Sequence, residues 1–398
     1  MSDALARLFN DFDRGRISRR RLLQALGVAA AVRPISAFAQ GQCGGARASL
    51  PECDPTPAKL PFEPTGWKTV LLDHFSMQVA DYQKEAAYFA ALMNWKIRSD
   101  DGTKAVLDIG NWGGLEIRGG YQPPAPANPP AAPAAGAAAA GAAGAGAAGA
   151  AGTAGGGRGG GGGGGRAPRT AVFDSFCWGI APWNAKTVEA ELKKRGLTPV
   201  ADNRAGGFES FHIKDADGFD LQISNGNSKN RRRGAANGKV SAPAPFEATN
   251  WKTLWLDHIS FETSNYKEQA AFYHALIGWT LGQDEGSQNT CEISDAIGGI
   301  IIRRGGGGGG RATAAGAAGA APAPPPVRRA AIGHIAFGIS PWDADQVKAE
   351  LDKRGLNARV DMGGAPNTLE AMRTAKYQSY HTTTPNGFDL QISNVISK

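Results

Sequence analysis

The sequence predicts an α+β protein with two tandem domains, each built from two modules in which a strand, a helix and further strands follow one another. Three observations predict this class. The chain repeats itself in order, each copy is interrupted once by an alanine- and glycine-rich tract, and each resulting segment begins with strand-like alternation that gives way to helical spacing. The 398 residues are enough for two or three domains with cores of their own.

The internal repeat is direct. The nine residues that begin at Gly66 return with few changes at Asn250, and both runs end in Asp-His. The octapeptide Gly-Phe-Asp-Leu-Gln-Ile-Ser-Asn occurs unchanged at Gly218 and at Gly387. Because the shared motifs keep their order while the spacing between them differs, the two copies share one fold and differ in the lengths of their loops.

The repeat also sets the expected domain boundaries. The low-complexity inserts lie at equivalent places in the two copies, and they hold too few large apolar side chains to offset the entropy of ordering, so we expect them to be mobile. The expected parts are an export signal (1–39), a short segment (40–65), copy 1 (66–225, insert about 122–169), a linker (226–249) and copy 2 (250–398, insert about 305–329).

Helix signals recur at matching positions of the modules. In copy 1, residues 70–79 alternate like a strand, and Asp81 is placed to cap a helix with apolar residues at helical spacing. In copy 2 the equivalent helix is expected to start near Asn265. The later helices, at about 185–195 and 344–354, each end at a glycine suited to a left-handed cap.

The N-terminal region has the features of an export signal. Residues 18–23, Ser-Arg-Arg-Arg-Leu-Leu, precede an apolar stretch at 25–32 and the small-x-small pattern Ala-Phe-Ala at 37–39. This arrangement resembles a twin-arginine signal, which implies export of a folded protein to the periplasm or beyond, with its metal already loaded. Elsewhere no stretch approaches the roughly 18 apolar residues that span a bilayer, so no transmembrane segment is expected in the mature chain.

Charge and motifs exclude several classes of function. The net charge of +7 is concentrated at the N-terminus, since the first 39 residues hold seven arginines and three aspartates. A basic groove interleaved with stacking aromatic residues is not evident, so no nucleic-acid partner is expected. The chain also shows no phosphate-binding loop, dinucleotide fingerprint or serine-nucleophile elbow. No sequence feature selects an oligomeric state.

The four cysteines fall into two groups. Cys43 and Cys53 follow the expected cleavage site, where an oxidising compartment would permit them to pair or to stay apart. Cys177 and Cys291 lie inside apolar strand patterns and are expected to be buried packing residues.

Strand alternation places three polar side chains of copy 2 on a face that does not form the core. His258 shares its face with polar residues, His334 shares its face with Ala336 and Gly338, and Gln391 lies opposite the apolar residues of its strand. Small neighbours leave room for a ligand. Three separate strands therefore offer His258, His334 and Gln391 to one open face.

These residues carry a family resemblance. The segment 384–391, Thr-Pro-Asn-Gly-Phe-Asp-Leu-Gln, resembles the closing motif of vicinal-oxygen-chelate proteins, particularly extradiol dioxygenases, whose last position is a metal-binding glutamate. His258 and His334 match the places of that family's two histidine ligands. The resemblance implies Fe(II) or Mn(II), with another divalent metal or none left open, bound by His258, His334 and Gln391 beside a small substrate that binds through two oxygens.

Departures from the family pattern widen the set of hypotheses. Gln391 supplies no charge, and His381 stands where a tyrosine is common in extradiol dioxygenases, so we assign His381 a catalytic acid or base role. In copy 1, His74 and Gln222 persist, and Glu116 offers a glyoxalase-like partner for His74, whereas Ser175 replaces the second histidine. The copy 1 metal set is thus His74, Glu116 and Gln222, the weaker of the two.

The leading hypothesis is an exported metal-dependent enzyme similar to extradiol dioxygenases. The alternatives are a non-catalytic ligand-binding or assembly protein on the same scaffold, and a glyoxalase-like lyase or isomerase that uses Glu116.

Overall fold

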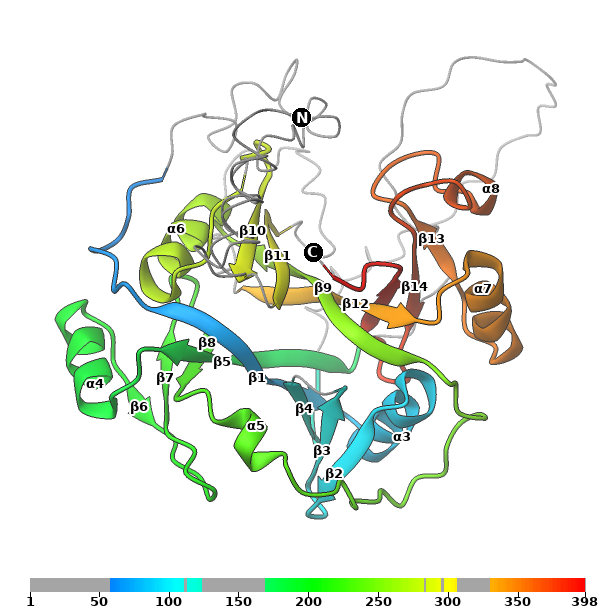
Figure 1. Ribbon diagram of the computed structural model, residues 1–398, viewed down its shortest axis with the longest axis horizontal. Helices are drawn as coiled ribbons and strands as arrows, with labels where there is room; N and C mark the ends of the chain where they lie inside the picture. Colours follow the sequence, from blue (N-terminus) through cyan, green and yellow to red (C-terminus); the bar gives the residue numbers. More distant parts are fainter. Residues whose placement is uncertain are drawn as a thin grey trace, which may run out of the picture. The chain divides into compact units, whose positions relative to one another are not determined.

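The structure is a computed structural model that describes residues 58–110, 113–123, 169–282, 284–294, 297–305 and 330–397. The export signal, Cys43, Cys53 and most of both inserts lie outside the described residues. Two mixed sheets of eight and seven strands, with helices between their strands, confirm the predicted α+β class (Figure 1). Within these ranges no helix combines the length and the apolar character needed to cross a membrane.

Copy 1 forms the eight-stranded sheet, in the order β2-β3-β4-β1-β5-β8-β7-β6. The central strands β1 and β5 pair antiparallel, and each has a parallel partner from its own module on its other side. Its elements are β1 (Lys68–Val79), α3 (Tyr82–Met93), β2 (Lys96–Asp100), β3 (Lys104–Ile109), β4 (Gly113–Arg118), β5 (Ala171–Ala181), α4 (Ala185–Lys194), β6 (Val200–Ala201), β7 (Ser210–Lys214) and β8 (Asp220–Ser224).

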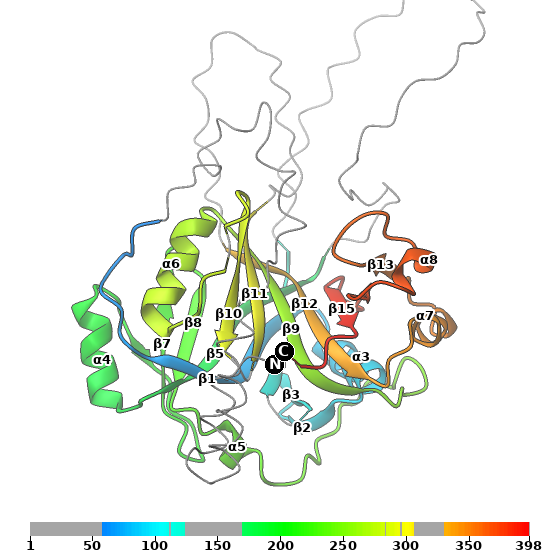
Figure 2. The same ribbon diagram turned by 45° about the horizontal axis from the view of Figure 1, so that its top comes forward.

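Copy 2 forms the seven-stranded sheet, in the order β10-β11-β9-β12-β15-β14-β13, with β9, β10 and β11 side by side in Figure 2. Its first module has one strand fewer, because the segment equivalent to β2 pairs through isolated bridges, Thr280 with Glu292 and Asp284 with Asn289. Its elements are β9 (Lys252–Thr263), α6 (Tyr266–Ile277), β10 (Gln288–Ser294), β11 (Ile297–Arg304), β12 (Ala331–Ser340), α7 (Ala344–Lys353), β13 (Arg359–Asp361), α8 (Leu369–Met372), β14 (Ser379–Thr383) and β15 (Asp389–Ser393).

The predicted helix caps are confirmed. The side chain of Asp81 accepts a hydrogen bond from the backbone N–H of Lys84, and Asn265 caps α6 in the same way. Gly196 and Gly355 follow α4 and α7 with φ angles of 76° and 69°, the left-handed conformation that glycine adopts without strain.

Each copy is preceded by a short segment that packs on the first helix of the other copy. The backbone N–H of Thr65 donates to the carbonyl of Ala275 in α6, and that of Thr249 donates to the carbonyl of Ala91 in α3, each at 2.9 Å. The hydroxyl of each threonine donates to the next carbonyl along its helix at 2.6 Å. The same connection is therefore made twice, in opposite directions.

Aromatic side chains complete this crossed packing. The indole N–H of Trp95 donates to Thr253 of copy 2 at 2.8 Å, and that of Trp279 donates to Thr69 of copy 1 at 3.1 Å. Phe176 of copy 1 packs against Tyr273 and Trp279 of copy 2, and all three are fully buried. A single hydrophobic cluster thus contains residues of both copies.

Two buried carboxyl groups lie in the same junction. Asp215, in the turn between β7 and β8, accepts hydrogen bonds from Gln269 and, at 2.8 Å, from the hydroxyl of Tyr273. Burial raises the pKa of Asp215 to about 6. Glu85 of α3 accepts from the backbone and side-chain amides of Asn386 at 3.1 and 2.8 Å, and burial raises its pKa as well.

Asp215→Asn should remove one titration from the stability profile. The pKa of Asp215 is about 6 in the folded protein and near 4 in the unfolded chain, so the folded protein holds this proton more tightly. The resulting stabilisation is fully present below about pH 4 and is lost as pH rises through about 6. Relative to the variant, the wild type should therefore lose up to about 3 kcal/mol of unfolding free energy between pH 4 and pH 7. Urea unfolding at several pH values measures the difference, with Glu370→Gln as an exposed control. Parallel profiles for wild type and Asp215→Asn would contradict this assignment.

Candidate metal centre

A β-bulge in β9 turns two adjacent polar side chains to the same face of the copy 2 sheet. Along β9, Leu256 and Ile259 are both buried in the core although they are three residues apart, which simple alternation forbids. The pairing of β9 with β12 shifts register at this point, leaving Asp257 as the extra residue. Asp257 and His258 consequently lie together on the face opposite the core.

A second bulge orients the second histidine. Ile332 and Ile335 of β12 are both buried, again three residues apart, and the register shift falls between Ile332 and His334. Gly333 is the extra residue, and His334 shares the face of His258. Both predicted histidines thus come from bulges on paired strands.

The two imidazoles converge. Nε2 of His258 lies 3.1 Å from Nε2 of His334. Two nitrogens at right angles around one ion, each about 2.1 Å from it, stand about 3.0 Å apart. Burial, followed by the charges of His258 and His381, holds the pKa of His334 well below its ordinary value, which favours the neutral imidazole that metals bind. On the far side of its ring, His258 has Asp257 at 3.4 Å from Nδ1, a carboxylate placed to orient the ring.

Gln391 lies in the same cross-strand row. Ala336 of β12 pairs with His258 on one side and with Gln391 of β15 on the other, and His381 of β14 follows Gln391. The small side chain of Ala336 leaves the space above it to its neighbours. Gln391 is 1% exposed, and its Oε1 has no hydrogen-bond partner among the described residues. A buried carbonyl oxygen without a donor suits a cation. The predicted residues His258, His334, Gln391 and His381 therefore gather at one place.

His381 is held between two carboxylates. Its Nδ1 lies 3.2 Å from Asp389 and its Nε2 lies 3.2 Å from Asp361. Burial lowers the pKa of His381, but the hydrogen bonds to Asp361 and Asp389 raise it more, so the net shift is upward and favours the charged imidazolium. His334, His381 and Asp389 also form a group with metal-binding atoms within 4.8 Å of one another, but Asp389 is paired with Arg359 at 2.6 Å. The open donors are therefore His258, His334 and Gln391.

Sequence reasoning missed Asp257, Asp361 and Tyr377. The hydroxyl of Tyr377 donates to Asp257 at 3.1 Å and accepts from Nε2 of Gln391 at 3.0 Å, so it connects the partners of two candidate ligands. One signal was available for Asp257, since the three-residue apolar spacing around Asp257 and His258 is that of a bulge. No sequence signal places Tyr377 or Asp361, because loop conformation brings them to the site.

In copy 1 the predicted pair of His74 and Glu116 comes together, but cations hold the carboxylate. Nε2 of His74 lies 3.8 Å from Glu116, whose two oxygens also contact Arg204 at 2.5 Å and Lys104 at 3.3 Å. Burial raises the pKa of Glu116, yet the charges of His74, Arg204 and Lys104 lower it to about 2. Glu116 is thus the centre of an ion-pair network.

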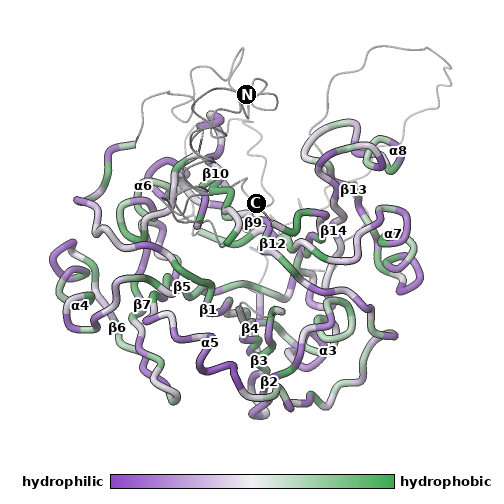
Figure 3. The backbone as a smooth tube through the Cα atoms, in the orientation of Figure 1, coloured by the Kyte–Doolittle hydropathy of each residue, from purple (hydrophilic) through white to green (hydrophobic). Residues whose placement is uncertain are grey.

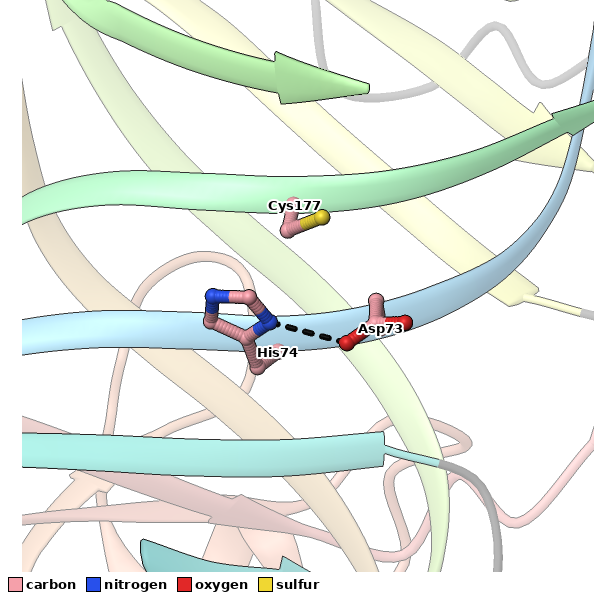
Figure 4. A group of neighbouring side chains, drawn as sticks. All are labelled: Asp73, His74 and Cys177. Carbon is pink, nitrogen blue, oxygen red and sulfur yellow. Dashed lines mark hydrogen bonds and ion pairs between the residues drawn. The ribbon is translucent and has the colours of Figure 1, made fainter. Parts of the chain in front are cut away.

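Asp73, the counterpart of Asp257, is also held by positively charged or polar partners. It lies 2.9 Å from Nδ1 of His74 and forms an ion pair with Arg231. Burial raises its pKa, but these two partners bring it to about 2. Figure 4 shows Asp73 and His74 beside Cys177 of the next strand, and the metal-binding atoms of the three lie within 4.8 Å of one another. As predicted, Cys177 is buried, and burial first, then the charge of Asp73, keep the pKa of its thiol well above its ordinary value, which opposes thiolate ligation.

Arg231 comes from the segment that the sequence indicated to be a linker, 226–249. This segment contains the short helix α5 (Ser228–Arg231), which is strongly hydrophilic in Figure 3. Arg231 stacks on Phe208 at 4.4 Å, and Arg232 donates to Asp108 at 2.9 Å and to the carbonyl of Asp73 at 3.0 Å. The segment therefore supplies cations to the copy 1 site, and a copy 1 metal ion would have to compete with them.

The fold and the site define a duplicated α+β protein with one open pair of imidazoles. No protein-family model matches the chain, and no curated protein matches it. Among solved structures it is similar to an Mn(II)-bound glyoxalase from Novosphingobium aromaticivorans (12% identity, 82% of each chain, TM-score 0.49). It is also similar to the 2,3-dioxygenase LapB from Pseudomonas sp. KL28 (11%, 82% of this chain and 92% of the other, 0.49) and to homoprotocatechuate 2,3-dioxygenase from Arthrobacter globiformis (13%, 84% and 82%, 0.47). At these identities and TM-scores the likeness carries no conclusion about this chain.

Arg231→Ala should destabilise copy 1. Removing this guanidinium leaves the fully buried carboxylate of Asp73 with one cationic partner fewer, at a cost of about 2 to 3 kcal/mol once the one-fifth exposure of Arg231 (21%) is taken into account. Urea unfolding measures the change, and Arg233→Ala, in the same segment but exposed, is the matched control. Equal stability of the two variants would show that Arg231 does not hold Asp73.

Proposed function

We propose that copy 2 binds a divalent metal ion, Fe(II) or Mn(II), through His258, His334 and the amide oxygen of Gln391. The observation that carries this proposal is the 3.1 Å separation of the two Nε2 atoms, supported by the unpartnered Oε1 of Gln391. Nitrogen and neutral oxygen donors in this combination suit both ions. Three protein donors would leave the remaining coordination positions of the ion to other ligands.

We further propose that the protein is an enzyme of the vicinal-oxygen-chelate type, acting on a small substrate that binds through two oxygens. A metal bound here would act as a Lewis acid toward those oxygens. Asp257 would orient the ring of His258, and the lowered pKa of His334 favours its neutral form. The ring centroid of His381 lies 5.0 Å from that of His334, and its raised pKa favours a charged ring, which would stabilise negative charge developing on the substrate.

Copy 1 has a different role in this proposal. Ser175 stands in the place of His334. Arg204 and Lys104 form ion pairs with Glu116, and Arg231 forms one with Asp73. We propose that copy 1 is a non-catalytic partner that completes the core of copy 2 through the crossed packing. A wholly non-catalytic binding protein, and a glyoxalase-like enzyme centred on Glu116, are outcomes that the first experiment below separates.

We also propose that the protein reaches the periplasm or the exterior by twin-arginine export. This rests on residues 18–39, with the Ser-Arg-Arg-Arg-Leu-Leu run, the apolar stretch and the Ala-Phe-Ala pattern.

Anaerobic loading with Fe(II) or Mn(II), followed by elemental analysis, should find one ion per chain. His334→Ala should lose that ion because a single imidazole remains, whereas His74→Ala, the matched change in copy 1, should keep it. Metal that follows His74 instead would favour the glyoxalase-like site at Glu116. Metal-free wild type after loading would favour the binding protein.

The double variant Arg19→Lys with Arg20→Lys should not be exported, because the twin-arginine pathway requires the arginine pair. Cell fractionation followed by immunoblotting measures the exported share, and the matched control is lysine at Arg14 and Arg16, upstream of the motif. Unchanged export of the Arg19 and Arg20 variant would contradict the proposed route.

A further inference from the structure

The partners of Gln391 surround one end of its amide. Nε2 lies 2.8 Å from Oγ of Ser379, 3.0 Å from Oη of Tyr377 and 3.4 Å from Oδ2 of Asp361. We refer to these three oxygens as the acceptor cage. Oε1, at the other end of the same amide, has no partner among the described residues.

Each atom of the cage is an acceptor, because its own proton is used elsewhere or is absent. The hydroxyl of Ser379 donates to the backbone carbonyl of Asp361 at 2.7 Å, and the hydroxyl of Tyr377 donates to the carboxylate of Asp257 at 3.1 Å. Oδ2 of Asp361 also lies 3.2 Å from Nε2 of His381, so this oxygen faces nitrogen atoms on two sides and acts as an acceptor. An NH2 group has two hydrogens to donate to these oxygens, whereas a carbonyl oxygen has none. The orientation of the amide is thereby determined, with Oε1 on the opposite side.

Copy 1 contains the same arrangement. Nε2 of Gln222 lies 2.8 Å from Oγ of Ser210 and 3.1 Å from Oδ2 of Asp202, and Ser210 donates to the carbonyl of Asp202 at 2.5 Å. Oε1 of Gln222 is likewise unpartnered among the described residues. The counterpart of Tyr377 is Phe208, which has no hydroxyl. The serine and aspartate oxygens of the acceptor cage therefore have counterparts in copy 1, whereas the tyrosine oxygen is found in copy 2 alone.

We propose that position 391 is built for an amide, with the acceptor cage directing Oε1 toward the histidine pair and Tyr377 acting as a positioning residue. A glutamate here would place a second carboxylate against the carboxylate of Asp361 and the lone pairs of Ser379 and Tyr377, in a buried site. This inference rests on the proposed function in one respect, namely that Oε1 faces a metal ion.

A neutral ligand set selects the charge of the substrate. His258, His334 and Gln391 would bring no negative charge into the coordination shell of a divalent ion, so negative charge in that shell would come from the two oxygens of the substrate. We therefore expect a doubly deprotonated chelating oxygen compound to bind the metal-loaded protein more tightly than a singly charged compound of similar size.

Four variants test the amide position: Gln391→Glu, Tyr377→Phe, the double variant Gln391→Glu with Asp361→Asn, and the copy 1 control Gln222→Glu. Two measurements are made on the full mature chain: the thermal midpoint of metal-free protein, and the Mn²⁺ dissociation constant. Gln391→Glu should lower the metal-free midpoint by roughly 5 °C or more. Asn at 361 offers an NH2 group to the new carboxylate and should recover most of that loss.

Tyr377→Phe should weaken Mn²⁺ binding about 10-fold, as loss of an orienting partner does, with a much smaller effect on the midpoint. Gln222→Glu should lower the midpoint without changing Mn²⁺ binding. In titrations of the Mn²⁺-loaded wild type, oxalate should bind more tightly than lactate. Equal or weaker binding of oxalate would overturn the assignment of substrate charge.

The two proposals fail separately. If Gln391→Glu keeps the wild-type midpoint, or binds Mn²⁺ at least about 10-fold more tightly than wild type, the cage does not select an amide, and the inference is overturned. If wild type binds no Mn²⁺, the proposed function fails, while the metal-free midpoints still decide whether the cage selects an amide.

Discussion

The site depends on two β-bulges in paired antiparallel strands. Without the extra residue in β9, strict alternation would send Asp257 into the core or His258 away from the open face. With it, both side chains share one face, and the matching bulge at Gly333 brings His334 beside them. Convergence of the two imidazoles is therefore a consequence of backbone register, which the surrounding sheet maintains over many paired residues.

Because the chain is duplicated, each backbone position of the site occurs in both copies. The side chains at these equivalent positions determine what each copy can bind. Copy 1 has an equivalent bulge at Asp73, so His74 meets a carboxylate just as His258 does. Ser175 then removes the second imidazole, and Arg231 and Arg204 form ion pairs with the carboxylates of Asp73 and Glu116. Polar side chains of copy 1 form ion pairs with one another. Through the crossed packing and its tryptophans, copy 1 also contributes to the same hydrophobic core as copy 2.

Sequence patterns predicted the features that depend on local chemistry. The repeat, the caps at Asp81 and Asn265, and the shared face of His258, His334 and Gln391 follow from spacing and alternation, and the structure contains them. The contacts that sequence missed join residues far apart in the chain. Arg231 reaches copy 1 from a segment that has the composition of a linker, and Tyr377 and Asp361 reach Gln391 through loop geometry that no periodicity encodes.

The central claim is that two imidazole nitrogens of copy 2 bind one ion. Pulsed electron paramagnetic resonance of the Mn²⁺-loaded protein measures this directly, because each coordinated nitrogen couples to the electron spin of the metal. Two imidazole nitrogens should couple in the wild type, and one should couple in any His258→Ala protein that retains the ion. Bound Mn²⁺ without nitrogen coupling, or with coupling unchanged by His258→Ala, would contradict it.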